Sequence, residues 1–206
     1  RWIPEWGEDR IKSMVVDRSD WCISRQRTWG VPIPMFYCED CGKEYITPDS
    51  IKKIASIFRE QGADAWYALD AKELIVEGAK CSCGCESFKK ETGIMDVWFD
   101  SGSSHAAVCE GKEDMTYPPD MYLEGNDQYR GWFQSSLLTA VATKGEAPYK
   151  TVITHGMIVD EEGNKMSKSK GNGVNPQDII KQYGADVLRL WVASLDFHND
   201  MRVSQD

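Results

Sequence analysis

The chain has 206 residues, of which 41% are apolar, and its formal net charge is -9. This length suffices for one domain, or for a domain with a small appendage, and the apolar share suffices for a core. The negative charge argues against a nucleic-acid contact spread over the whole surface, because phosphate binding depends on clustered lysine and arginine. No apolar run approaches the roughly 20 residues of a membrane span, and the N-terminus lacks signal-peptide features, so we expect a cytoplasmic protein without membrane contact.

The first part of the chain predicts short elements, followed by a region with a different sequence pattern. Residues 8–17 predict an amphipathic helix, because apolar side chains recur there at helical spacing among charges, and residues 21–24 predict a strand. Between residues 36 and 88, two Cys-Gly turns flank a further expected helix over residues 51–59. The apolar face of this second helix would carry Ile51, Ile54, Ala55 and Phe58. The region from 36 to 88 therefore resembles an inserted module.

The remainder predicts alternating strands and helices. We expect a buried strand over residues 121–125, a helix over 129–142 and a strand over 151–154. A further helix is expected to open at Asn175 as cap, with Pro176 as its first residue. This alternation favours a parallel sheet.

Ligands of such a sheet bind beyond the carboxyl ends of its strands. Glu124 and Gly125 end the first of the two expected strands, and His155 and Gly156 follow the second. The sequence therefore predicts a binding site that includes these positions.

The seven cysteines, an odd number in a chain without secretion signals, are typical of reduced thiols and of metal binding. Two close pairs, each followed by glycine, suit one structural tetrahedral zinc ion without a catalytic role, because four protein ligands leave no place for substrate. The alternative is reduced cysteines without metal. The expected ligands are Cys38, Cys41, Cys81 and Cys83, with Cys85 as an alternative to either member of the second pair.

Residues 165–172 form a polar loop in which lysines alternate with hydroxyl side chains before a Gly-Asn pair. Ammonium groups in such a loop can stabilise charge that develops on a polyphosphate. A Walker loop is excluded, because no glycine stands at the required spacing before a Gly-Lys-Ser/Thr triplet. The simpler alternative for a lysine and serine run is a solvated surface loop.

The string Lys-Met-Ser-Lys-Ser over residues 165–169 resembles the signature of class I aminoacyl-tRNA synthetases. The resemblance covers nearly the whole chain. Trp-Cys-Ile-Ser-Arg-Gln-Arg within residues 20–34 is similar to the isoleucyl, valyl and leucyl group. Trp-Phe-Asp-Ser-Gly within 96–104 and Glu-Gly-Asn-Asp-Gln within 124–133 resemble the isoleucyl members, which usually have serine in place of Asn126.

This resemblance implies an α/β fold, the second half of a Rossmann-like parallel-sheet catalytic domain with a small zinc-binding insertion. Residues 1–35 would join the editing domain to the catalytic core, residues 36–95 would be the insertion, and residues 96–206 would carry the lysine loop. The His-Ile-Gly-His signature of the first half occurs nowhere in these residues. We therefore expect the isolated chain to be inactive.

The resemblance also implies roles for particular residues. The aminoacyl-adenylate would be contacted by Glu124, Gly125, Asp127 and Gln128, with Trp98 and Trp132 as walls for the aliphatic side chain. ATP would be bound by His155, Gly156, Met157, Ser167, Lys168 and Ser169, and catalysis would rest on Lys165 and Lys168. Without the resemblance, a strand that ends in Leu-Glu-Gly is more often an ordinary turn, and a tryptophan is more often core.

The implied reaction is activation of L-isoleucine with ATP, accompanied by Mg²⁺, followed by transfer to tRNA(Ile) by an enzyme that is monomeric at full length. A valyl- or leucyl-tRNA synthetase remains the nearest alternative. A non-catalytic zinc module that binds RNA would fold with zinc and ignore adenylates. An unrelated nucleotidyltransferase with a lysine loop would bind ATP without preference for an amino acid.

Overall fold

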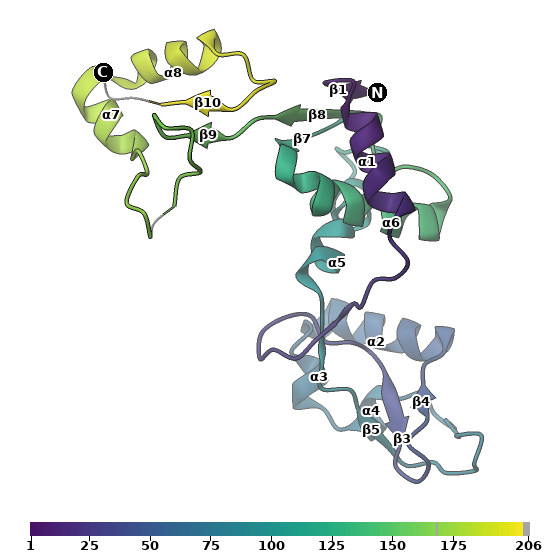
Figure 1. Cartoon of the computed structure of the whole chain (residues 1–206). Coiled ribbons are helices and arrows are strands. Elements are labelled where there is room, and N and C mark those ends of the chain that lie inside the picture. The colour runs from purple at the N-terminus through teal and green to yellow at the C-terminus, as the bar shows by residue number, and fades with distance from the viewer. Residues whose placement is uncertain (168, 204–206) are drawn as a thin grey trace. The chain divides into compact units, whose positions relative to one another are not determined.

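The computed structural model describes residues 1–167 and 169–203. The chain forms two compact units, one made of residues 1–19 and the chain from residue 101 onward, the other of residues 20–100 (Figure 1). The expected insertion over residues 36–95 lies within the second unit, and the expected segment 1–35 is divided between the two. Each unit has a hydrophobic core of its own.

A three-stranded parallel sheet organises the first unit. Its order is β1 (Trp2–Ile3), β8 (Thr151–His155) and β7 (Met121–Gly125). The expected parallel sheet is confirmed, and the two-residue strand β1 was not foreseen. β7 and β8 pair in register from Met121 opposite Thr151 to Gly125 opposite His155. The carboxyl ends of both strands therefore lie side by side.

Two helices cover one face of this sheet, α1 (Gly7–Val16) and α6 (Trp132–Lys144). Alternate side chains of a strand point to opposite faces, so Tyr122 of β7 packs into this core, which comprises Ile11, Tyr122, Tyr129, Phe133, Tyr149 and Val152. The expectation of a fully buried strand was wrong for Met121 and Leu123, which are 52% and 53% exposed. β7 is an edge strand, and these two side chains point away from the helices.

α6 begins three residues later than expected, because a tight 3-10 turn over Asn126–Arg130 precedes it. The side-chain oxygen of Gln128 accepts a hydrogen bond from the backbone N–H of Trp132 at 3.0 Å, which satisfies a donor at the first turn of the helix. Buried Tyr129 in the same turn shares a 2.7 Å hydrogen bond with Thr154 of β8. The turn is thereby fixed to the sheet.

After β8 the first unit continues through elements at its C-terminal end, which are β9 (Ile158–Val159), α7 (Pro176–Tyr183), α8 (Ala185–Ser194) and β10 (Met201–Arg202). β9 and β10 pair in parallel. The expected cap of α7 is confirmed, since the Asn175 side chain accepts from the N–H of Gln177. Ahead of β7 lie α5 (Val97–Gly102), which begins in the second unit, and a π-helical turn, His105–Glu110.

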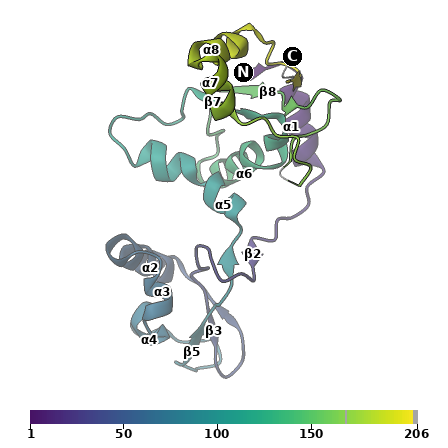
Figure 2. The same ribbon diagram turned by 90° about the vertical axis from the view of Figure 1, so that its left-hand side faces the viewer.

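The second unit contains an antiparallel sheet with short helices (Figure 2). Its elements are β2 (Ser24–Arg25), β3 (Phe36–Cys38), β4 (Glu44–Tyr45), α2 (Pro48–Gln61), α3 (Ala65–Ala68), α4 (Ala71–Leu74), β5 (Phe88–Lys90) and β6 (Ile94–Met95). The sheet order is β4-β3-β5, and β2 pairs with β6 apart from it. The strand expected over residues 21–24 corresponds to β2, which begins only at Ser24. It has two residues because its partner β6 has only two.

The core of the second unit surrounds Phe36 and Trp66, which are 0% and 1% exposed. α2 starts earlier than expected, since Thr47 and Ser50 form a reciprocal capping box ahead of it. Of the expected apolar face, Ile54 is buried but Ala55 is exposed, and Ile57 packs against the core instead.

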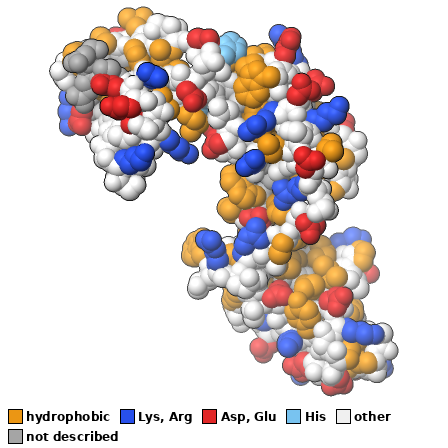
Figure 3. Space-filling view, in the orientation of Figure 1, with side chains coloured by type: hydrophobic (Ala, Val, Ile, Leu, Met, Phe, Trp, Pro, Cys, Tyr) orange, Lys and Arg blue, Asp and Glu red, His pale blue; other side chains and the backbone are white. Residues whose placement is uncertain are grey.

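Among the described residues, no helix is long and apolar enough to cross a membrane. On the face drawn in Figure 3, lysine and arginine side chains are interspersed with acidic ones.

Candidate functional site

The paired strand ends of β7 and β8 bring Glu124 and His155 together. One carboxylate oxygen of Glu124 accepts the backbone N–H of Gly125 at 2.9 Å and lies 3.8 Å from Nε2 of His155. Nδ1 of His155 lies 2.7 Å from the carbonyl oxygen of Gly156, which can only accept, so Nδ1 carries a proton and donates it. Nε2, the other ring nitrogen, faces the Glu124 carboxylate.

Gly125 stands where any side chain would fill the site. A Cβ atom there would lie 3.0 Å from the Asp127 carboxylate, 3.2 Å from the Met157 sulfur and 3.5 Å from the His155 ring. Glycine therefore leaves room for a ligand to approach the backbone between these groups. With Glu124, these residues form what we call the strand-end site.

Gly156 is constrained in a different way, because it packs directly against the backbone of the segment that leads into β10. A Cβ atom on Gly156 would lie 2.1 Å from the carbonyl oxygen of Asn199. The same segments are joined by hydrogen bonds from Gly156 N–H to Phe197 O at 2.9 Å and from Met157 N–H to the Asp200 carboxylate at 2.8 Å. Glycine is thus required here by packing, and no local sequence signal pointed to Asn199 or Asp200.

The remaining residues expected at the adenylate are placed as follows. Asp127 is exposed in the turn after β7, and Gln128 caps α6. Trp132 stacks on Tyr122 with ring centroids 4.0 Å apart, while its indole N–H donates to Ser101 O and to the Ser104 hydroxyl, both at 3.1 Å. Its orientation is therefore fixed by the ring stacked on one face and by two hydrogen bonds at its edge.

Trp98 belongs to the second unit, where it is 41% exposed. It lines a cavity of about 920 Å³ whose other walls include Arg25, Arg27, Trp29 and Tyr67. No local sequence pattern predicts this cavity. Arg25 forms a 2.7 Å ion pair with Asp96 at its rim.

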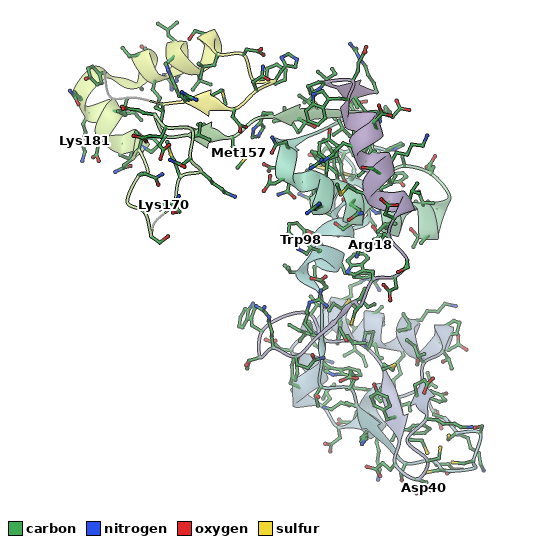
Figure 4. All side chains as sticks on the ribbon, in the orientation of Figure 1. Arg18, Asp40, Trp98, Met157, Lys170 and Lys181 are labelled. Carbon is green, nitrogen blue, oxygen red and sulfur yellow. The ribbon has the colours of Figure 1, made fainter. Side chains whose placement is uncertain are left out.

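The lysine loop follows β9, and Figure 4 shows Lys170 on it and Met157 at the junction between β8 and β9. Lys165 is exposed and forms an antiparallel β-bridge with Val159. The first residue of the loop therefore pairs with β9. The hydroxyls of Ser167 and Ser169 lie 3.2 Å apart. Lys168, expected to be catalytic and to bind ATP, lies outside the described residues.

Four cysteines of the second unit form a compact group (Asp40 in Figure 4 marks the first of the two turns). Their sulfur atoms all lie within 4.8 Å of one another, with Cys38 and Cys83 3.6 Å apart and Cys41 and Cys81 3.5 Å apart. Tetrahedral zinc with bonds of about 2.3 Å sets its sulfur ligands about 3.8 Å apart. The group can therefore hold a metal ion of this kind.

The two turns that present these sulfurs use glycine at positive φ, Gly42 at +71° and Gly84 at +96°. The backbone N–H of Cys41 lowers the pKa of the Cys38 thiol to about 6, which favours the metal-binding thiolate. Cys85 is not in the compact group; its sulfur accepts the N–H of Ser87 at 3.3 Å. Sequence spacing had left Cys85 open as a ligand.

Comparison with known proteins places these features in one family. The profile of the family described as tRNA synthetases class I (I, L, M and V) matches residues 1–204. The chain belongs to this family. Its fold is accordingly the Rossmann-like α/β fold of class I synthetase catalytic domains.

The chain is similar to isoleucine--tRNA ligases of several organisms. It is 67% identical over its whole length to an isoleucine--tRNA ligase of Caldicellulosiruptor bescii, and 66% identical to that of Caldicellulosiruptor saccharolyticus. An isoleucine--tRNA ligase of Natranaerobius thermophilus is 63% identical over 99% of the chain. The chain spans about a fifth of the length of these relatives, 22% in each case.

Two solved synthetases share the fold. A leucyl-tRNA synthetase of Agrobacterium radiobacter, in a ternary complex with tRNA and LeuAMS, gives a TM-score of 0.64 at 21% identity over 89% of this chain and 25% of its own. A methionyl-tRNA synthetase of Mycobacterium tuberculosis, in complex with methionyl-adenylate, gives 0.60 at 19% identity over 99% of this chain and 31% of its own.

Proposed function

We propose that this chain is the second half of the catalytic region of an isoleucine--tRNA ligase. The whole protein activates L-isoleucine with ATP to isoleucyl-adenylate, releases pyrophosphate and transfers the isoleucyl group to tRNA(Ile). The observation that carries the proposal is the convergence of Glu124, Gly125 and His155 at the ends of two adjacent parallel strands. The choice of isoleucine over valine or leucine is supported by relatives at 61–67% identity.

The strand-end site suits a ligand that donates hydrogen bonds. The Glu124 carboxylate accepts hydrogen bonds, lies 3.8 Å from Nε2 of His155, and is 49% exposed and so accessible. An ammonium group or a ribose hydroxyl placed beside it would donate to this carboxylate. In our proposal Asp127 and Gln128 bind the adenylate beside Gly125, and His155, Gly156 and Met157 bind its adenine side.

In the same proposal Trp98 and Trp132 are walls for the aliphatic side chain. The fixed orientation of the Trp132 indole supports this role. A side chain that is already ordered loses little conformational entropy when the ligand binds. A pocket of this kind distinguishes one methylene by only about 1 to 3 kcal/mol, a limit for which the synthetases of isoleucine and valine are the standard example.

Catalysis is assigned to Lys165 and Lys168, which would stabilise negative charge on the departing pyrophosphate, with Ser167 and Ser169 binding ATP beside them. Mg²⁺ would accompany ATP. The reaction requires positioning and charge stabilisation and no covalent enzyme intermediate.

One structural zinc ion is proposed at Cys38, Cys41, Cys81 and Cys83. The compact spacing of their sulfurs supports this donor set. With four protein ligands the ion would have no open position, so its contribution is to the folding of residues 36–88. Reduced cysteines of this kind suit a cytoplasmic protein, and we expect the full-length enzyme to be monomeric.

The proposal is tested by isoleucine-dependent exchange of pyrophosphate into ATP. We expect exchange by the full-length protein that carries this chain, and no aminoacylation by the 206-residue chain alone. Valine and leucine serve as matched substrates. Exchange that prefers valine or leucine would contradict the isoleucine assignment, and absence of amino-acid-dependent exchange by the full-length protein would contradict the activity.

A further inference from the structure

The lysine loop is closed at its base by two polar side chains, Asp160 and Asn172. Asp160 directly follows β9, and Asn172 stands at the far end of the loop. The amide nitrogen of Asn172 donates to the Asp160 carboxylate at 2.7 Å, and its amide oxygen accepts the backbone N–H of Ser167 at 2.9 Å. One side chain thus joins the entry, the middle and the exit of the loop.

Asp160 is itself fixed by the turn that follows it. Its second carboxylate oxygen accepts the backbone N–H of Asn164 at 2.6 Å, and its own N–H donates to Asn164 O at 3.0 Å. The hydrogen bond from Asn172, with further ones from Asn164, lowers the pKa of the Asp160 carboxyl, so the group is ionised and acts only as an acceptor. Both residues are half-buried although their neighbours Glu161, Glu162 and Gly171 are exposed.

We infer that Asp160 and Asn172 are positioning residues that hold the backbone of Lys165 to Ser167 in register for nucleotidyl transfer. This inference rests on the proposed function. The hydrogen-bond directions are determined, because Asp160 only accepts, so Asn172 must turn its amide nitrogen toward Asp160 and its oxygen toward Ser167. Displacement of a catalytic group by about 1 Å can cost on the order of a hundredfold in rate.

These directions define a pair of matched substitutions. In Asp160→Asn, the new amide oxygen can accept from the Asn164 N–H only if the new amide nitrogen faces the amide nitrogen of Asn172. Two donors then face each other, and the hydrogen bond between the two side chains is lost. In Asn172→Asp, two carboxylates face each other and the donor is lost. The double variant restores the short hydrogen bond between positions 160 and 172 with its polarity reversed, since the amide at position 160 donates to the carboxylate at position 172, which still accepts from Ser167. Two longer contacts, both at 3.4 Å, from Asn172 to Lys165 O and from Asn164 to Asp160, are not restored.

The experiment measures isoleucine-dependent pyrophosphate exchange in the full-length protein for wild type, both single variants and the double variant. Glu162→Gln, which removes the same charge from the same turn at an exposed position, is the control. We expect kcat to fall at least tenfold in each single variant, with the KM for isoleucine within twofold of wild type. The double variant should recover to within threefold of wild type, and the control should match wild type.

Thermal unfolding of each variant separates loss of position from loss of fold, because the inference requires melting temperatures close to that of wild type. Equal kcat in all variants, or a double variant as slow as the single ones, would overturn the inference while leaving the proposed function intact. Absence of exchange in the wild-type protein would instead overturn the proposed function.

Discussion

Glu124 at the end of β7 lies 3.8 Å from Nε2 of His155 at the end of β8. The pairing of Gly125 with His155 in the parallel register fixes this relationship, because it sets the strand ends level. A carboxylate and an imidazole nitrogen held this close by backbone geometry can contact the same polar group of a ligand. Both side chains remain partly exposed, at 49% and 37%, and so accessible to such a ligand.

Replacement of Glu124 by glutamine should weaken adenylate binding more than it weakens folding. A hydrogen bond to a charged group contributes roughly 1.5 to 3 kcal/mol, so we expect a loss of about tenfold to a hundredfold in affinity. Titration with an adenylate analogue measures this loss. Glu161→Gln, an exposed change outside the strand-end site, should leave affinity unchanged. Equal affinity of Glu124→Gln and wild type would remove Glu124 from the site.

Replacement of Gly156 by alanine should destabilise the first unit, because the added methyl group meets the backbone oxygen of Asn199 at 2.1 Å. Overpacking of this kind costs about 1 to 3 kcal/mol. Denaturant unfolding measures the change in the free energy of unfolding. Gly173→Ala is the control, since no described atom lies within 4 Å of its Cβ position and its backbone is not at positive φ. If both variants are equally stable, the close packing of residues 156 and 199 is wrong.

Metal binding should depend on Cys81 and not on Cys85. We expect Cys81→Ser to abolish the binding of one zinc ion per chain, and Cys85→Ser to retain it, because only the former sulfur belongs to the compact group. Metal content after gel filtration separates the two. A chelator should lower hydrogen-exchange protection over residues 36–88 before other regions, and unchanged protection there would contradict a structural role for zinc.

Acid should destabilise the second unit through Glu91. Its carboxylate accepts from the Tyr37 hydroxyl, Thr92 N–H and Gly93 N–H, each at 2.7 Å. The Tyr37 hydroxyl, with the two backbone donors, lowers the pKa of Glu91 below its ordinary 4.5. A carboxyl group whose pKa is lower in the folded state stabilises that state above the unfolded pKa, and the contribution is lost as pH falls through the folded value.

The free energy of unfolding of the second unit should therefore decrease from about pH 5 downward. Glu91→Gln should flatten this dependence, whereas the exposed Glu77→Gln should leave it in place. Denaturant titrations at a series of pH values, followed by the fluorescence of buried Trp66, measure the slope. An identical slope in Glu91→Gln and wild type would show that other groups cause the acid sensitivity.

Much of this architecture was predictable where a local pattern carried it. Strand and helix alternation predicted the parallel sheet, and Asn175-Pro176 predicted the start of α7. Cysteine spacing predicted the thiol group and left Cys85 as an alternative to Cys81 or Cys83. In the structure the compact group contains Cys81 and Cys83, and the Cys85 sulfur lies 3.3 Å from the backbone nitrogen of Ser87.

Other features depend on contacts that have no local signature. β1 has two residues, Trp2–Ile3, too few to show a period. The approach of Gly156 to Asn199 joins positions 43 residues apart, and Asp160 and Asn172 are joined across a polar loop without periodicity. Such pairs become visible only once the chain is folded.

The most direct test of the central claim is calorimetric titration of the zinc-loaded chain with a non-hydrolysable isoleucyl-adenylate analogue, using the valyl and leucyl analogues as competitors. The account predicts saturable binding that prefers the isoleucyl compound and that is lost in Glu124→Gln. Binding with no preference among the three analogues, or binding that Glu124→Gln leaves unchanged, would contradict it.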